Sequence, residues 1–84
     1  SLKDKRVMEI KTKFSIGETV YGFNDKHKLV EFEVAKILIA IDDDSIIVTY
    51  YPSDGRGGCD FYKSHEEAYC FKSKEEALNY VSGK

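Results

Sequence analysis

The chain has 84 residues, of which 42% are hydrophobic, 13% aromatic and 33% charged, and its formal net charge is −2 at pH 7. This balance excludes an intrinsically disordered chain, and the length limits the protein to one domain with a modest core. The small negative charge excludes strong overall attraction to nucleic acid, and no apolar run approaches the ~20 residues of a membrane-spanning helix. No signal peptide is recognisable, so we expect a small soluble domain with a cytoplasmic location.

Residues 1–13 show no sustained hydrophobic period and are predicted to form a flexible lead-in to a single domain over residues 14–84. The lead-in is locally basic, although Asp4 and Glu9 dilute its charge. A charged terminus of this kind is usually a solvated tail, and the alternative is a role in nucleic-acid binding. The basic residues of the lead-in are Lys3, Lys5, Arg6, Lys11 and Lys13.

Two β-strands are predicted next, over residues 14–23 and 29–41, joined by a polar turn over residues 24–28. The second strand alternates apolar and polar residues, with the apolar set at even positions through Val34 and at odd positions from Ile37. A side-chain period of two cannot change phase without a bulge or a sharp bend. We therefore predict a bent strand with its kink near Ala35 and Lys36.

A turn over residues 42–45 leads to a third strand over residues 46–51, which is apolar enough to be buried on both faces and which Pro52 ends. After a loop rich in glycine, residues 59–71 are predicted to form a β-hairpin that turns at Ser64 and His65. This register places Lys63 opposite Glu66. It also places Cys59 opposite Cys70.

A C-terminal helix is predicted over residues 73–82. Ser73 is a good N-cap, and Glu76, three residues later, completes a capping box. Ala77, Leu78 and Val81 form an apolar stripe at helical spacing, and Gly83 can end the helix. A helix of about ten residues is marginal alone in water, so we expect it to pack on the β-sheet.

Five short strands, tight turns and one terminal helix predict a mostly β fold, a small and partly open barrel. The segment 14–21, with the sequence FSIGETVY, resembles the first strand of SH3-like barrels of the Tudor and KOW type. The segment 71–77, FKSKEEA, resembles the end of small bacterial and phage proteins with that barrel. This resemblance covers most of residues 14–82 and implies a five-stranded SH3-like barrel that acts as a binding module.

No catalytic pattern is recognisable, so we expect neither an enzyme nor a cofactor. The glycine-rich segment 55–58 lacks the lysine and the following helix of a phosphate-binding loop. Cys59, His65 and Cys70 lack the close cysteine pairs of zinc sites, so we expect no metal. The two cysteines are best explained as small buried side chains, with a disulfide as the alternative.

The aromatic residues are the strongest functional candidates, because barrels of this class bind partners through aromatic side chains that face outward. The alternative is that most of these aromatic residues lie in the core, as is usual in a small domain. We expect a protein or peptide to bind an exposed patch, and the acidic Glu31 and Glu33 favour a basic partner. The candidate binding residues are Tyr21, Phe23, Tyr51, Arg56, Tyr62 and Tyr69.

Two other interactions remain open. Nucleic acid could bind in the manner of a KOW or Tudor-like barrel, using Lys26, Lys28, Arg56, the lead-in and stacked tyrosines. The very apolar segment 37–41 could also lie at a sheet edge and pair with a second copy of the chain. The protein is therefore expected to be a monomer or a weak homodimer, without a membrane partner.

Overall fold

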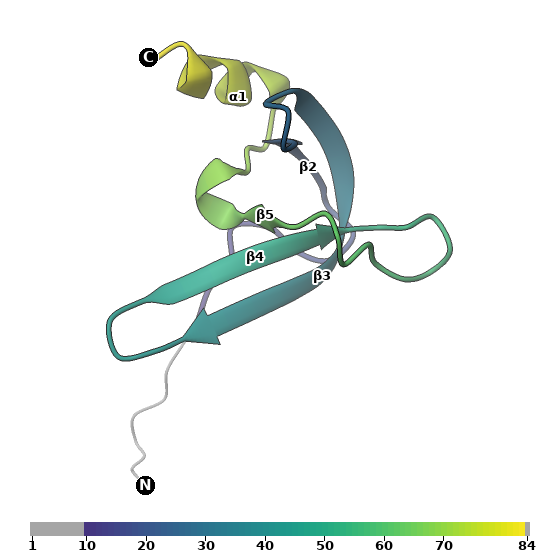
Figure 1. Cartoon of the computed structure of the whole chain (residues 1–84), viewed down its shortest axis with the longest axis vertical. Coiled ribbons are helices and arrows are strands. Elements are labelled where there is room, and N and C mark those ends of the chain that lie inside the picture. Colours follow the sequence, from purple (N-terminus) through teal and green to yellow (C-terminus); the bar gives the residue numbers. More distant parts are fainter. Residues whose placement is uncertain (1–9, 84) are drawn as a thin grey trace, which may run out of the picture.

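The computed structural model describes residues 10–83, which form one curled antiparallel sheet and a short C-terminal helix. The strands follow the order β2-β3-β4-β5 in the sheet, as Figure 1 shows. The elements are β2 (Thr19–Phe23), β3 (Leu29–Ile41), β4 (Ile46–Pro52), β5 (His65–Glu66), the 3₁₀ helix η1 (Glu67–Tyr69) and α1 (Lys74–Val81). The predicted mostly β class is confirmed, and the sheet has four strands over residues 10–83, so the predicted five strands are not confirmed.

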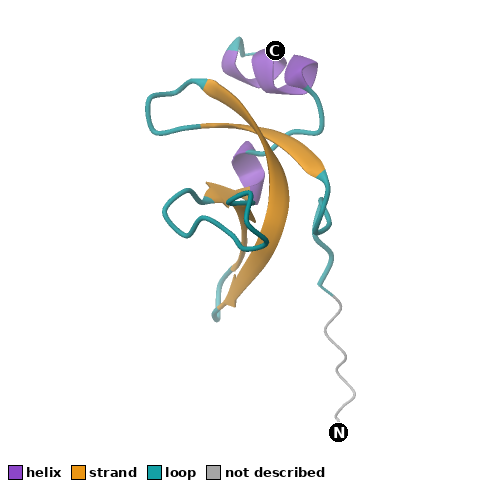
Figure 2. Cartoon of the chain, turned by 90° about the vertical axis from the view of Figure 1, so that its right-hand side faces the viewer, coloured by secondary structure: helices purple, strands orange, loops and turns teal. Residues whose placement is uncertain are grey.

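The predicted bend in the second strand is confirmed. β3 pairs with β2 from Leu29 to Glu33 and with β4 from Val34 to Ile41, and the register with β4 shifts between Val34 and Lys36. Ala35 is the extra residue of this bulge, which explains why the inward-facing positions change parity there. Figure 2 shows the resulting curve, which turns the sheet into half of a barrel.

A small core fills the concave side of the sheet. Tyr50 lies at its centre with no exposed surface, and its hydroxyl donates a hydrogen bond of 2.6 Å to the Glu67 carboxylate and accepts one of 3.2 Å from the Phe14 amide. Burial and the Glu67 hydrogen bond raise the pKa of Tyr50 to about 12. The buried hydrophobic residues are Phe14, Val20, Phe32, Val34, Val48, Tyr50, Cys70 and Ala77.

The hairpin predicted over residues 59–71 is wrong. Cys59 pairs with Ser53 on the same loop, and Phe71 pairs with Tyr21 on the outer edge of β2. The strand between them is β5, which pairs with Thr49 and Tyr50 of β4. The two ends of the segment lie against different strands, so they cannot face one another. The sequence has no tight-turn signal that would have joined them.

The prediction that residues 46–51 are buried on both faces is also wrong. β4 is buried only toward Pro52, and its first two residues, Ile46 and Ile47, are exposed. Burial on both faces requires a layer of structure on each side. α1 packs against β2 and η1 against β4, and they leave Ile46 and Ile47 about half exposed. The hairpin of β3 and β4 consequently projects from the rest of the protein to its turn at residues 42–45 (Figure 1).

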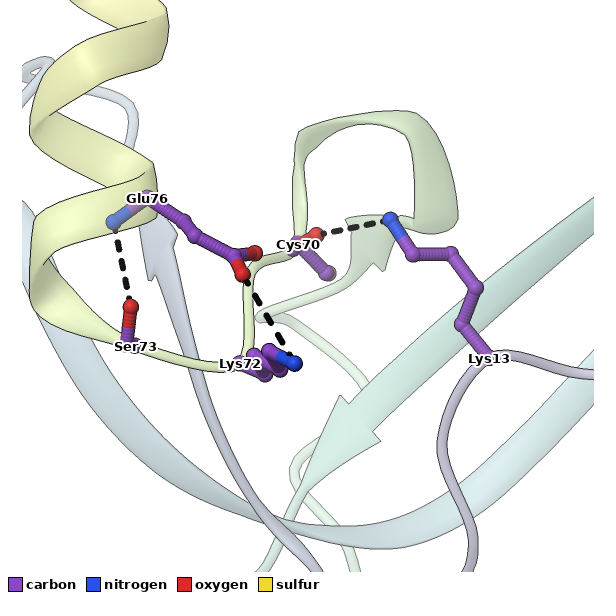
Figure 3. Close-up of polar contacts among 5 residues, drawn as sticks. All are labelled: Lys13, Cys70, Lys72, Ser73 and Glu76. Carbon is purple, nitrogen blue, oxygen red and sulfur yellow. Dashed lines mark hydrogen bonds and ion pairs between the residues drawn. The ribbon is translucent and has the colours of Figure 1, made fainter.

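The predicted C-terminal helix is confirmed, with its caps. The Ser73 hydroxyl accepts a 3.1 Å hydrogen bond from the Glu76 amide, and Lys72 forms an ion pair with Glu76 (Figure 3). Gly83 follows the helix with a φ of 78°, a left-handed conformation that favours glycine. The predicted apolar stripe is only partly used, because Ala77 is buried whereas Leu78 and Val81 are exposed.

Lys13, in the predicted lead-in, contacts the segment around η1. The Lys13 amide donates to the Glu67 carboxylate, and the Lys13 ammonium donates to the Cys70 carbonyl at 3.3 Å (Figure 3). The flexible lead-in was predicted over residues 1–13, and its residues 1–9 lie outside the described part of the chain. Over residues 10–83, no helix is both long enough and apolar enough to cross a membrane.

Candidate functional site

The described part of the protein contains a groove of about 880 Å³. One wall is formed by the end of β2 and the turn after it, and the floor by the first half of β3. The loop from Asp60 to His65 forms the opposite wall, with Pro52 and Ser53 at its base. We call this hollow the acidic groove. Its volume is within the range typical of ligand-binding clefts.

The floor of the acidic groove is a stacked pair of rings. The rings of Phe32 and His65 lie nearly parallel, at 15°, with centroids 4.4 Å apart. Gly22 lies beside them, and a β-carbon at that position would lie 3.1 Å from Nδ1 of His65 and 3.5 Å from Phe32. Because Gly22 has no side chain, the His65 ring can pack closely against its backbone. Burial lowers the pKa of His65 from its ordinary value, so the ring is uncharged at pH 7.

The walls carry the charge of the groove. Four carboxylates line it, from Asp25, Glu31, Glu33 and Asp60, against two lysines, Lys26 and Lys63. The residues that line the groove therefore carry an excess of two negative charges, which favours a positively charged ligand there.

One aromatic ring at the rim has almost no protein contact. The side chain of Tyr62 is 97% exposed, although the backbone that carries it is held in place. The Asp60 carboxylate accepts a 3.0 Å hydrogen bond from the Tyr62 amide, and the Asp60 amide donates to the Pro52 carbonyl at 2.9 Å. The second carboxylate oxygen of Asp60 lies 3.8 Å from the Lys63 ammonium. Asp60 therefore positions the loop as well as contributing charge.

The structure brings together two of the six candidate binding residues. Phe23 and Tyr62 both line the acidic groove. Tyr51 is half-buried beside Phe61, whose ring also lies 4.7 Å from the Lys36 ammonium. These contacts give Tyr51 a packing role at the base of the projecting hairpin.

The other three candidate residues lie away from the groove. Tyr69 packs against Tyr80 of α1, with ring centroids 6.0 Å apart, and so helps to attach the helix. Tyr21 is half-buried and joins the backbone of Phe71 to β2. Arg56 is exposed on the loop after β4, where its amide donates to the Asp54 carboxylate. A single patch of all six residues does not form.

Sequence reasoning missed the aromatic floor of the groove. Phe32 reads as an ordinary core residue of an alternating strand, and His65 as part of a hairpin turn. The stack depends on the pairing of β5 with β4, which no local pattern signals. The acidic wall was partly foreseen, because Glu31 and Glu33 occupy the outward positions of the same strand.

The cysteines offer no chemistry at this site. Both are free thiols, and Cys70 is buried, with its sulfur 3.3 Å from the Glu66 carbonyl. Burial raises the pKa of the Cys70 thiol to about 12, far from a reactive thiolate. In residues 10–83, no three histidine, cysteine or acidic side chains gather in a way that could hold a metal ion.

Comparison of the chain with protein-family models, with curated proteins and with solved structures found no match. Function therefore has to be argued from the acidic groove itself. It combines an aromatic floor, acidic lining residues and the exposed ring of Tyr62, a combination of groups that favours cations.

Proposed function

We propose that this domain is a protein-interaction module that binds an extended, lysine- or arginine-rich peptide segment in the acidic groove. The observation that carries this proposal is the excess of acidic over basic residues among those that line the groove, four against two. Guanidinium and ammonium groups form charge-assisted hydrogen bonds with carboxylates, and these are stronger than bonds between neutral groups. The role is binding and not catalysis.

The aromatic residues add a second kind of recognition. Phe23 and Tyr62 line the groove beside its carboxylates, and Tyr62 offers a ring that nothing else in the described part of the protein covers. A cation placed over such a ring gains about 0.5–1 kcal/mol at an exposed site. Because His65 is uncharged at pH 7, it does not repel a cationic side chain from the floor.

We also propose that the fold belongs to the SH3-like class of small barrels. The likeness of segment 14–21 to the first strand of those barrels supports this, together with the bent β3 and the curl of the sheet. A binding role fits that class, although fold alone does not fix function.

The test is an NMR titration of the ¹⁵N-labelled protein with three probes of equal length: a lysine- and arginine-rich peptide, its glutamate-rich counterpart and a mixed oligonucleotide. We expect the basic peptide to shift the amides of Phe23, Glu31, Tyr62 and His65, with weaker binding as salt increases. Shifts from the oligonucleotide alone would favour the nucleic-acid alternative. No shift from the basic peptide at millimolar concentration would refute the proposal.

Matched variants locate the binding surface. Replacing Glu31 and Glu33 together by glutamine should weaken binding of the basic peptide by about 2- to 30-fold, given about 0.2–1 kcal/mol for each of the two exposed charge pairs. The control is Glu75→Gln, the same chemical change in the first turn of α1, outside the groove. Tyr62→Ala should weaken binding by about 10-fold if its ring contacts the ligand. Equal losses in the control would place binding elsewhere.

A further inference from the structure

The projecting hairpin carries an unusual surface. We call its residues 36–48 the arm: they comprise β3 after its bulge, the turn, and the start of β4. Five aliphatic side chains on the arm are between 36% and 51% exposed, namely Leu38, Ile39, Ile41, Ile46 and Ile47. Together they expose on the order of 400 Å² of apolar surface, divided between the two faces of the arm because side chains alternate along a strand.

One edge of the arm has open backbone groups. On the side of β3 that faces β2, pairing within the described residues 10–83 ends at Val34, which bonds to the backbone of residues 17 and 18. From Lys36 to Ile41, no strand of the described residues 10–83 pairs with this edge. Its residues 37–41 contain neither a charge nor a proline. Natural proteins protect such edges with charges, prolines or a covering element, because an open apolar edge recruits another strand.

We propose that the β3 edge of the arm pairs with the same edge of a second copy of this chain, antiparallel across a two-fold axis at Ile39. In this register Ile37 faces Ile41 of the other copy, and Leu38 faces its Ala40. The contact is self-complementary, as a two-fold interface requires. It extends the sheet to the order β4-β3-β3-β4 across both copies and leaves neither β3 edge open.

Charge favours this register over its neighbours. With Ile39 on the axis, Lys36 of each copy lies opposite Asp42 of the other, so that two ion pairs flank the apolar centre. A shift of the axis by one residue toward the start of β3 leaves both charges unmatched. A shift the other way places Lys36 opposite Asp44, which lies further into the turn and out of line with the strand. Opposite charges directly across a strand pair stabilise it by about 0.2–1 kcal/mol.

Both charged groups are prepared for this contact. One oxygen of the Asp42 carboxylate, Oδ1, accepts bonds from the Asp44 amide and from the amide and hydroxyl of Ser45, so Oδ2 remains for a lysine. The turn amides that bond to Asp42 lower the pKa of its carboxyl, which is therefore ionised at neutral pH. The Lys36 side chain is exposed, with its ammonium over the ring of Phe61 at the base of the arm.

The dimer should be weak. Pairing along one six-residue edge covers less than the ~800 Å² per partner of a standard interface, so we expect a Kd on the order of 100 µM. The first test is sedimentation velocity over a concentration series up to 1 mM. A protein that remains monomeric throughout this range overturns the proposal.

A charge exchange tests the register. In K36E, two acidic residues face each other at each end of the contact, and in D42K two lysines do. Each variant alone should therefore dimerise at least 5-fold more weakly than the wild type. An equimolar mixture should dimerise as the wild type does, because the introduced glutamate of one copy then faces the introduced lysine of the other, and the native Lys36 faces the native Asp42. Unchanged dimerisation of both single variants, or no recovery in the mixture, would overturn the register.

A cysteine pair tests the axis even if D42K loosens the turn. Ile39→Cys places two thiols directly opposite each other, with the α-carbons about 4.5–5.5 Å apart, within the reach of a disulfide. Mild oxidation should link most of this variant into a covalent dimer. The control is Ala40→Cys, which faces Leu38 of the other copy and has the same native thiols, Cys59 and Cys70. Equal cross-linking of the two variants would show that Ile39 does not lie on the axis.

Discussion

The arm and the rest of the domain, which we call the body, contain the same kinds of apolar residues. These residues are buried in the body and largely exposed in the arm. In the body, Val20 and Val34 are almost completely buried, as is Tyr50. In the arm, Ile41 and Ile46 face each other across the strands and are about half exposed. Because the arm is the more apolar of the two in sequence, hydrophobicity alone does not decide burial. A strand is buried only where another part of the chain can reach its face.

The largest effect should come from the centre of the body. Tyr50→Ala removes a fully buried ring, leaves the Phe14 amide without its partner and removes one of the hydrogen bonds to the Glu67 carboxylate. We expect a loss of about 3–5 kcal/mol in the free energy of unfolding. Urea denaturation followed by circular dichroism measures it. Tyr62→Ala is the control, because that ring is exposed, and a comparable loss there would contradict the distinction between body and surface.

The close packing under the acidic groove should give an intermediate effect. Gly22→Ala places a β-carbon 3.1 Å from the His65 ring, which must move to admit it. Overpacking of this kind costs about 1–3 kcal/mol, and we expect the lower end because one side of the ring faces the groove. The displaced ring should also become better solvated, so its pKa, followed by NMR, should rise toward the ordinary value. An unchanged His65 titration would mean that the stack tolerates the methyl group.

The same histidine makes the stability of the body depend on pH. Burial lowers the pKa of His65 in the folded protein below its ordinary value of 6.5. The unfolded chain therefore takes up the proton first as the pH falls. Stability from this group is complete above about pH 7.5, decreases through pH 6.5 and levels off below the folded pKa. Urea denaturation from pH 8 to pH 5 should show a smaller decrease for His65→Gln, and parallel curves would exclude His65 as the cause.

The smallest effect should come from the arm. Ile41→Ser removes a side chain that is 49% exposed near the turn, so we expect a change within about 0.5 kcal/mol in the free energy of unfolding. The free energy of unfolding should be measured at a protein concentration of about 5 µM, because pairing between copies adds little stability there. A loss above about 1.5 kcal/mol at that concentration would mean that Ile41 is covered within one chain and that the arm belongs to the body.

Local rules within the sequence determined the elements whose stabilising contacts are near in the chain. The change of parity between Val34 and Ile37 was enough to locate the bulge, because side chains alternate along a strand. Ser73 and Glu76 were enough to locate the start of α1, because the cap is closed over three residues. The negative wall of the groove was visible in part, because Glu31 and Glu33 share the outward positions of one strand.

Tertiary structure alone decided the features that depend on residues far apart in sequence. Segment 59–71 contains extended pieces, but only the partners β4 and β2 determined that they separate and do not form a hairpin. The groove follows from the same pairing, because it brings His65 onto Phe32. The exposure of the arm follows from where the two helices lie. Strands and turns could be predicted from the sequence because they depend on neighbouring residues. Burial could not be predicted, because it depends on which surfaces of the folded chain meet.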